Sequence, residues 1–113
     1  MKTFVFSFAF ITLAFAAASF AQGSEKEAVR VPLENYIKGH ETGDAEYMKK
    51  AFHTEGNLIF VRDGKYTTRS FAEYIAGMSG KPAVDESKRK RAIESVDVAG
   101  NAAIARIVLD YPS

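Results

Sequence analysis

The chain contains no cysteine, which excludes disulfide bonds, thiolate metal ligands and a cysteine nucleophile. It also has no glycine-rich phosphate loop and no serine in the tight strand-to-helix turn that hydrolases use. Hydrolase and nucleotide-binding functions are therefore not predicted. A hydrophobic core alone must stabilise whatever fold forms.

An excess of charge of either sign is also missing. The 15 Lys and Arg residues nearly balance 14 Asp and Glu residues, for a formal net charge of +1. Nucleic-acid binding normally needs cations clustered on one face, so no nucleic-acid partner is expected. The one basic run, Lys88-Arg89-Lys90-Arg91, is interpreted as the solvated end of a strand, on which alternate side chains point to opposite faces.

Histidine is scarce as well. The two histidines, His40 and His53, lie thirteen residues apart without a carboxylate at helical ligand spacing beside them. The sequence therefore predicts no metal site and no cofactor.

Long apolar runs are absent except at the N-terminus. Lys2 precedes an apolar stretch at residues 4–18, and the small residues Ser19 and Ala21 occupy the positions that a signal peptidase reads. Residues 1–21 are predicted to be a signal peptide cleaved before Gln22, the alternative being an uncleaved anchor helix. The remaining domain, residues 22–113, is expected to be exported, periplasmic or secreted, with no membrane contact after cleavage.

Two helices are predicted in the first half of this domain. Ser24 is the expected cap of a helix whose apolar positions recur at three- and four-residue spacing, with Pro32 disturbing its first turns. After Gly39 and Gly43, Asp44 is the expected cap of a second helix whose apolar side includes Tyr47 and Phe52.

Two hairpins and a third helix follow. Asp63-Gly64 is a two-residue turn joining the β-rich residues 58–61 to residues 66–68. Ser70 and Glu73 form a capping box that opens a helix expected to reach Met78. Strands at 91–98 and 102–111 are joined at Gly100-Asn101, so the fold class is α+β.

This order of helices and strands is similar to that of a known superfamily. Together with Tyr36-Ile37-Lys38-Gly39, Gly43-Asp44, Ala51-Phe52-His53 and the strand at 57–61, it resembles the nuclear transport factor 2-like superfamily, closest to its lumazine-binding-like branch. The resemblance implies three helices packed on a curved, mostly antiparallel sheet in a cystatin-like cone, with a ligand pocket between them. Members usually continue with two further strands, so the domain is expected to be C-terminally incomplete.

The resemblance also suggests a role for Tyr36. It lies eight residues before Asp44, a spacing similar to that of the oxyanion-binding tyrosine in ketosteroid isomerases of this superfamily. Those isomerases place a carboxylate on the following strand, whereas residues 57–60 here contain no acid.

His53 and Asp97 are the candidate bases for such chemistry. An imidazole at a helix end can serve as a base or ligand contact, but it can equally cap the helix. Asp97 and Asp110 lie on strands, and Asp110 shares strand parity with Arg106, which favours a surface ion pair.

Aromatic residues complete the candidate ligand site. Tyr36, Tyr47, His53 and Phe60 are the predicted ligand-binding residues, because rings around an apolar concavity suit a flat ligand. The aromatic members of this set are also ordinary core residues.

Three functional hypotheses remain open. The leading one is an exported domain that binds a small apolar or heterocyclic ligand without assignable catalysis. The second is an isomerase- or dehydratase-like enzyme with Tyr36 as donor and His53 or Asp97 as base. The third is a dimeric interaction module, and a homodimer is expected because a small domain without disulfides gains stability by pairing.

Overall fold

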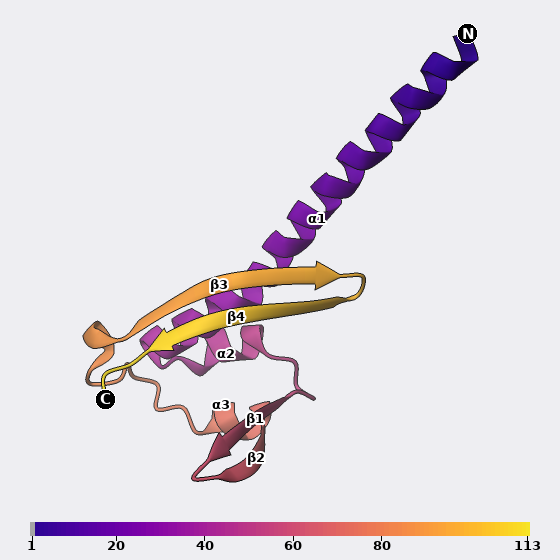
Figure 1. The fold of residues 1–113 in the computed structure, drawn as a ribbon. Coiled ribbons are helices and arrows are strands. Elements are labelled where there is room, and N and C mark those ends of the chain that lie inside the picture. Colours follow the sequence, from indigo (N-terminus) through magenta and orange to yellow (C-terminus); the bar gives the residue numbers. More distant parts are fainter. Residues whose placement is uncertain (1) are drawn as a thin grey trace.

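The structure is a computed structural model that describes the backbone of residues 2–113 and the side chains of residues 22–113. It consists of helices and two β-hairpins (Figure 1), an α+β architecture that confirms the predicted fold class. The elements in chain order are α1 (Lys2–Thr42), α2 (Ala45–Ala51), β1 (Asn57–Arg62), β2 (Lys65–Ser70), α3 (Phe71–Ala76), the 3-10 turn η1 (Glu86–Lys88), β3 (Lys90–Ala99) and β4 (Ala102–Asp110).

Helix α1 is longer than predicted. Its backbone passes through Ser24 and Pro32 without a break, so the expected helix start at Ser24 is wrong. Proline removes one amide donor, but the turns on either side keep their hydrogen bonds and the helix continues. The predicted signal peptide, residues 1–21, lies outside the described side chains. Among the described residues, none of the helices has the length and apolar character needed to cross a membrane.

The junction between α1 and α2 depends on glycine. Gly43 has a φ of +72°, and its amide donates to the carbonyl of Gly39 over 2.9 Å, a left-handed helix C-cap. Asp44 then caps α2 as predicted, because its carboxylate accepts from the amide of Glu46 over 2.9 Å. A chain reversal is thus encoded in two consecutive residues.

Two glycines also let other elements approach closely. A Cβ atom at Gly43 would lie 2.0 Å from the carbonyl oxygen of Lys81, and one at Gly39 would lie 2.8 Å from the side chain of Met48. Met48 is the one fully buried large side chain in the described part of the chain. Neither glycine position could carry a larger residue without a shift of its neighbours.

The first hairpin and α3 follow the predicted local chemistry. Asp63 and Gly64 both have positive φ values, of 51° and 73°, as a type I′ turn requires. The hydroxyl of Ser70 accepts from the amide of Glu73 over 3.2 Å and caps α3. Helix α3 ends at Ala76, earlier than predicted, because Gly77 terminates it.

The second hairpin packs along α1, as Figure 1 shows. Residues 103, 105, 107 and 109 of β4 face the helices, whereas Ile104 and Val108 face outward and are exposed. The register shifts between Ile93 and Ser95 of β3, a β-bulge.

The strands form two separate two-stranded antiparallel sheets, β1–β2 and β3–β4. The resemblance implied one curved sheet, whereas no ladder joins the two hairpins among the described residues. Figure 1 places β3–β4 beside α1, and β1–β2 together with α3 as a second group.

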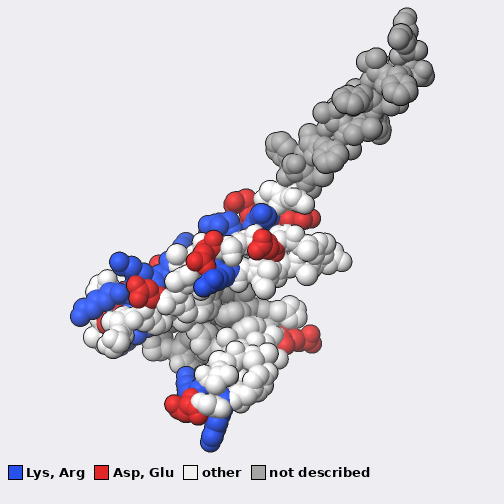
Figure 2. All heavy atoms as spheres, in the orientation of Figure 1, with Lys and Arg blue, Asp and Glu red and all other residues white. Residues whose placement is uncertain are grey.

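The basic run at residues 88–91 is partly neutralised. Arg89 pairs with Asp85 over 2.8 Å, and Arg91 pairs with Glu86, so two of its four cations have acidic partners. Figure 2 shows cationic and anionic side chains interspersed on the visible face.

Candidate functional site

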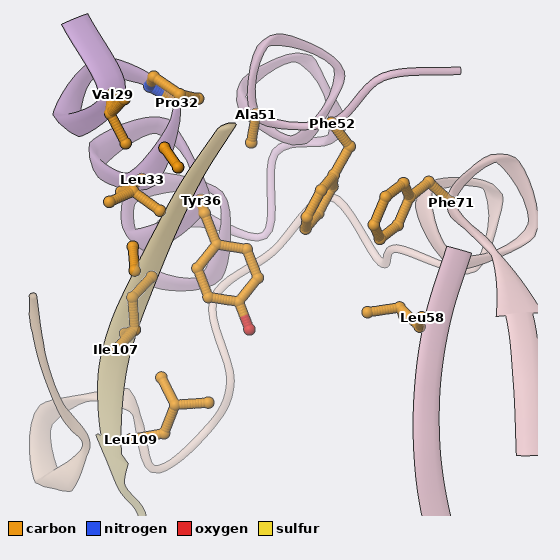
Figure 3. Close-up of a pocket in the computed structure, with 12 residues that line it drawn as sticks. Val29, Pro32, Leu33, Tyr36, Ala51, Phe52, Leu58, Phe71, Ile107 and Leu109 are labelled. Carbon is orange, nitrogen blue, oxygen red and sulfur yellow. The ribbon is translucent and has the colours of Figure 1, made fainter. Parts of the chain in front are cut away.

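A cavity of about 680 Å³ lies between the helices and the two hairpins (Figure 3). Apart from Tyr36, every residue that lines it carries a hydrocarbon side chain. Helix α1 contributes Val29, Pro32, Leu33 and Tyr36. Strand β4 contributes Ala103, Ala105, Ile107 and Leu109, and the remaining lining residues are Ala51, Phe52, Leu58 and Phe71.

Simple periodicities bring these residues together. The α1 residues recur at helical spacing and form one stripe, and the β4 residues alternate and form one face of the strand. Two of the strand residues, Ala103 and Ala105, are small, which leaves space that larger side chains would fill. The cavity therefore forms because the helical and strand periodicities bring these residues together and because some of their side chains are small.

Aromatic rings form one wall of the cavity. Phe52 and Phe71 are stacked, with ring centroids 3.9 Å apart and planes 15° from parallel. Tyr36 meets Phe52 edge-on, with centroids 5.5 Å apart and an interplanar angle of 75°. Figure 3 shows the three rings facing the same space.

The Tyr36 hydroxyl is the polar group of this apolar surface. It points into the open space (Figure 3) and forms no hydrogen bond with another described residue. Burial raises the pKa of Tyr36 to about 12, and the nearby Tyr74 and Tyr111 hydroxyls add to the rise while Arg91 opposes it. The phenol is therefore protonated at neutral pH and available as a hydrogen-bond donor.

His40 lies beside Tyr36 near the end of α1. Its Nε2 is 3.1 Å from the Tyr74 hydroxyl, because the end of α1 packs against α3. Burial lowers the pKa of His40, and the positive charge of Arg91 lowers it further. His40 is therefore a neutral imidazole at pH 7, able to donate or accept through Nε2 according to its tautomer.

A buried arginine supports this cluster from β3. The Arg91 side chain is 2% exposed, and its guanidinium binds both carboxylate oxygens of Glu86. Its Nε donates to the Tyr111 hydroxyl over 2.9 Å, and its Cζ lies 4.9 Å from the centroid of that ring. The hydrogen bond from Arg91 lowers the pKa of the Glu86 carboxyl.

Of the predicted ligand-binding residues, Tyr36 alone lines this cavity. The Tyr47 ring lies 5.8 Å from both the Lys38 and the Lys50 ammonium groups, and the Phe60 ring lies 5.2 Å from the Arg62 guanidinium. Neither Tyr47 nor Phe60 lines the large cavity.

His53 is exposed and follows α2. Its Nδ1 accepts from the amide of Glu55 over 3.2 Å, so the imidazole organises the turn after the helix. It lines a different apolar cavity, of about 410 Å³, to which Phe52 and Phe71 also contribute. Tyr36 and His53 therefore face different cavities.

Asp97 lies on the outward face of β3, opposite the exposed Ile104. The bulge between Ile93 and Ser95 adds one residue, so the inward face continues at Val96 and Val98 and Asp97 points away. The structure thus does not bring Tyr36, His53 and Asp97 to one cavity.

The ion pair expected between Arg106 and Asp110 does not form. Arg106 instead pairs with Glu94, the residue at the bulge, over 2.8 Å.

The sequence analysis did not single out His40 or Tyr74 as neighbours of the site. The available signal was the four-residue spacing of Tyr36 and His40, which places both on one face of a helix. Among the described residues, no three His, Asp or Glu side chains gather to hold a metal ion.

Comparison with known proteins identifies relatives of this chain. The family model described as "Putative lumazine-binding" matches residues 24–113. A nuclear transport factor 2-like protein of unknown function from Shewanella baltica OS155 is 28% identical, with a TM-score of 0.67 over 77% of this chain and 70% of that one. A similar protein from Silicibacter pomeroyi DSS-3, also of unknown function, is 20% identical, with a TM-score of 0.58 over 85% of this chain and 75% of that one. The second likeness shows the fold alone. A search of curated proteins found no match.

Proposed function

This chain belongs to the "Putative lumazine-binding" family of the nuclear transport factor 2-like superfamily, and we propose that it binds a small, flat, apolar or heterocyclic ligand in the cavity around Tyr36. The cavity volume of about 680 Å³ falls in the range of small-molecule sites. The family description supports a heterocyclic ring as the ligand.

The observation that carries this proposal is a single phenol, without a hydrogen-bond partner among the described residues, on an apolar, aromatic cavity wall. An unpaired donor in apolar surroundings gains most from a ligand that supplies an acceptor. Tyr36 would donate to a carbonyl oxygen or ring nitrogen, while Phe52 and Phe71 pack against the ligand. The site would therefore select rings that carry an acceptor at one edge.

The lining residues favour binding over catalysis. No carboxylate, amine or imidazole lines this cavity within the described part of the chain, so none of these lining residues can act as a base toward a ligand bound there. An isomerase-like reaction needs both a donor and a base within hydrogen-bond reach of one ligand. The neutral His40 contacts the Tyr36 ring but lines a different cavity.

Export and pairing are parts of the proposal that rest on other features. We propose that residues 1–21 are a signal peptide and that the mature domain works in the periplasm or outside the cell. We also propose a homodimer, which the exposed apolar residues Ile104 and Val108 on the outward face of β4 would favour.

A titration with lumazine, followed by the ligand's own fluorescence, tests the proposed cavity. Ala105→Phe fills the cavity from β4 and should abolish saturable binding, because Ala105 lines it. Ile104→Phe places the same ring on the outward face of the same strand and should bind like the unaltered protein. Equal binding by both variants would refute this cavity as the site.

A further inference from the structure

A third cavity, of about 250 Å³, lies where the ends of α1 and α3 meet the segment that leads to η1. It differs from the large cavity in its chemistry. Three cationic residues line it, Arg69, Lys81 and Arg89, and none of the described residues that line it is an Asp or Glu. Asp85 pairs with Arg89, so two of the three cationic residues have no acidic partner among the described residues, and such a concave surface attracts an anion.

Arg69 has most of its donors available. Its Nη2 makes one long contact, 3.4 Å, with the carbonyl oxygen of Glu73, and no salt bridge involves it among the described residues. The guanidinium lies against Gly77, where an added Cβ would be 3.3 Å from Nη2. Gly77 also lines the cavity, so the guanidinium lies at its edge.

The Arg89 side chain is fixed by its contacts, but some of its hydrogen-bond donors remain available. Its Nε is 2.8 Å from the carboxylate of Asp85, and its Cζ lies 4.5 Å from the centroid of the Tyr111 ring. These contacts fix the side chain, while the terminal amino groups of the guanidinium form no hydrogen bond with a described residue. A fixed guanidinium with open donors suits a planar or tetrahedral oxyanion.

A neutral donor completes the arrangement. Tyr74 and His40 both line this cavity, and they share one hydrogen bond of 3.1 Å. When the His40 proton is on Nε2, the imidazole donates to the Tyr74 oxygen and the Tyr74 hydroxyl is free to donate to an anion. The cavity therefore offers charged and uncharged donors together.

We propose that this cavity binds an oxyanion, a carboxylate or phosphate group, through Arg69, Lys81 and Arg89 with the Tyr74 hydroxyl as an added donor. The site extends beyond the ligand cavity described above and does not depend on it. Because His40 lines this cavity and contacts the Tyr36 ring, the oxyanion is either a free ion or the anionic substituent of a ring bound in the large cavity.

Inorganic phosphate and acetate are the probes, titrated at low ionic strength while the imidazole resonances are followed by NMR. Saturable shifts of the His40 resonance are expected. Arg69→Gln and Lys81→Gln should each weaken phosphate binding by roughly tenfold or more, the usual effect of losing a charged hydrogen bond. Lys90→Gln removes the same charge from an exposed position on β3 and should change it less than about twofold.

The two sources of the oxyanion are separated by competition. If the free ion is the ligand, phosphate binds alone and leaves lumazine binding unchanged. If the oxyanion belongs to a ring ligand, phosphate displaces a carboxylated pteridine but not lumazine. Failure of lumazine binding with intact phosphate binding would refute only the large-cavity proposal. Absence of saturation with every anion, or equal weakening by Lys81→Gln and Lys90→Gln, would overturn the oxyanion site.

Discussion

The imidazole of His40 packs edge-on against the ring of Tyr36, with 4.6 Å between the ring centroids and 79° between the planes. The two residues are one helical turn apart on α1, so the helix places them on one face. Tyr36 lines the large cavity, and His40 lines the cavity of Arg69, Lys81 and Arg89. This pair of rings is therefore the wall that the two candidate sites share.

The first prediction concerns the titration of His40. Its pKa is lowered in the folded state, so the unfolded chain binds more protons as the pH falls. The stability it contributes is complete above the ordinary histidine pKa, near 6.5, and is lost as the pH falls from there through the lowered folded value. Urea unfolding of the unaltered protein and of His40→Gln at several pH values checks this, since the variant should lose less stability over that interval. A variant with the same pH dependence would contradict the assignment.

The second prediction concerns the ion pair of Arg91 and Glu86. The Arg91 side chain is 2% exposed and that of Glu86 is 19% exposed, so Arg91→Met leaves a carboxylate with little water around it. We expect a loss of roughly 2 kcal/mol in the free energy of unfolding, because breaking a buried pair strands one charge. Arg106→Met is the matched control, since its pair with Glu94 is 74% and 49% exposed, and it should cost less than about 0.5 kcal/mol. Similar losses in both variants would show that burial of Arg91 does not matter.

The third prediction separates backbone strain from close packing. Gly43 and Gly64 both have positive φ values, but a Cβ at Gly43 would strike the Lys81 carbonyl whereas none of the described atoms lies within 4 Å of one at Gly64. Gly64→Ala should cost about 1 kcal/mol, the usual strain of a left-handed conformation. Gly43→Ala should cost at least about 3 kcal/mol, because the α1–α2 junction must also move away from residue 81. Chemical denaturation measures both, and equal costs would argue against the close approach.

The fourth prediction concerns processing. Cleavage before Gln22 would give a mature chain that begins at that residue. Intact mass spectrometry of protein recovered from an exporting host, under gentle and denaturing conditions, reports the cleavage site and any dimer together. A mass that retains residues 1–21 would instead support an uncleaved anchor.

The helix caps and the first hairpin turn of this chain could be predicted from its sequence. Asp44 and Ser70 cap their helices, and Asp63-Gly64 forms its hairpin turn, because each depends on a few neighbouring residues. The phenol of Tyr36 in an apolar cavity was also anticipated, although through resemblance and not from spacing alone.

Properties that depend on distant residues were not predictable in the same way. The face on which Asp97 lies depends on the bulge at Ile93 and Ser95, and one extra residue reverses every later side chain of the strand. The burial of His40 depends on its contact with Tyr74 of α3, and these two residues are thirty-four positions apart in the sequence. The orientation of Asp97 and the burial of His40 are therefore set by tertiary structure and not by local secondary-structure propensity.

The proposed function depends most on the Tyr36 hydroxyl. Tyr36→Phe removes one oxygen and keeps the ring against Phe52, so only the donor is lost. Isothermal titration with lumazine should show binding weakened roughly fivefold in this variant, as expected for one neutral hydrogen bond. Tyr47→Phe makes the same change outside the cavity and should bind like the unaltered protein. Equal affinity of Tyr36→Phe and the unaltered protein, or no binding by either, would contradict a ligand site built around this phenol.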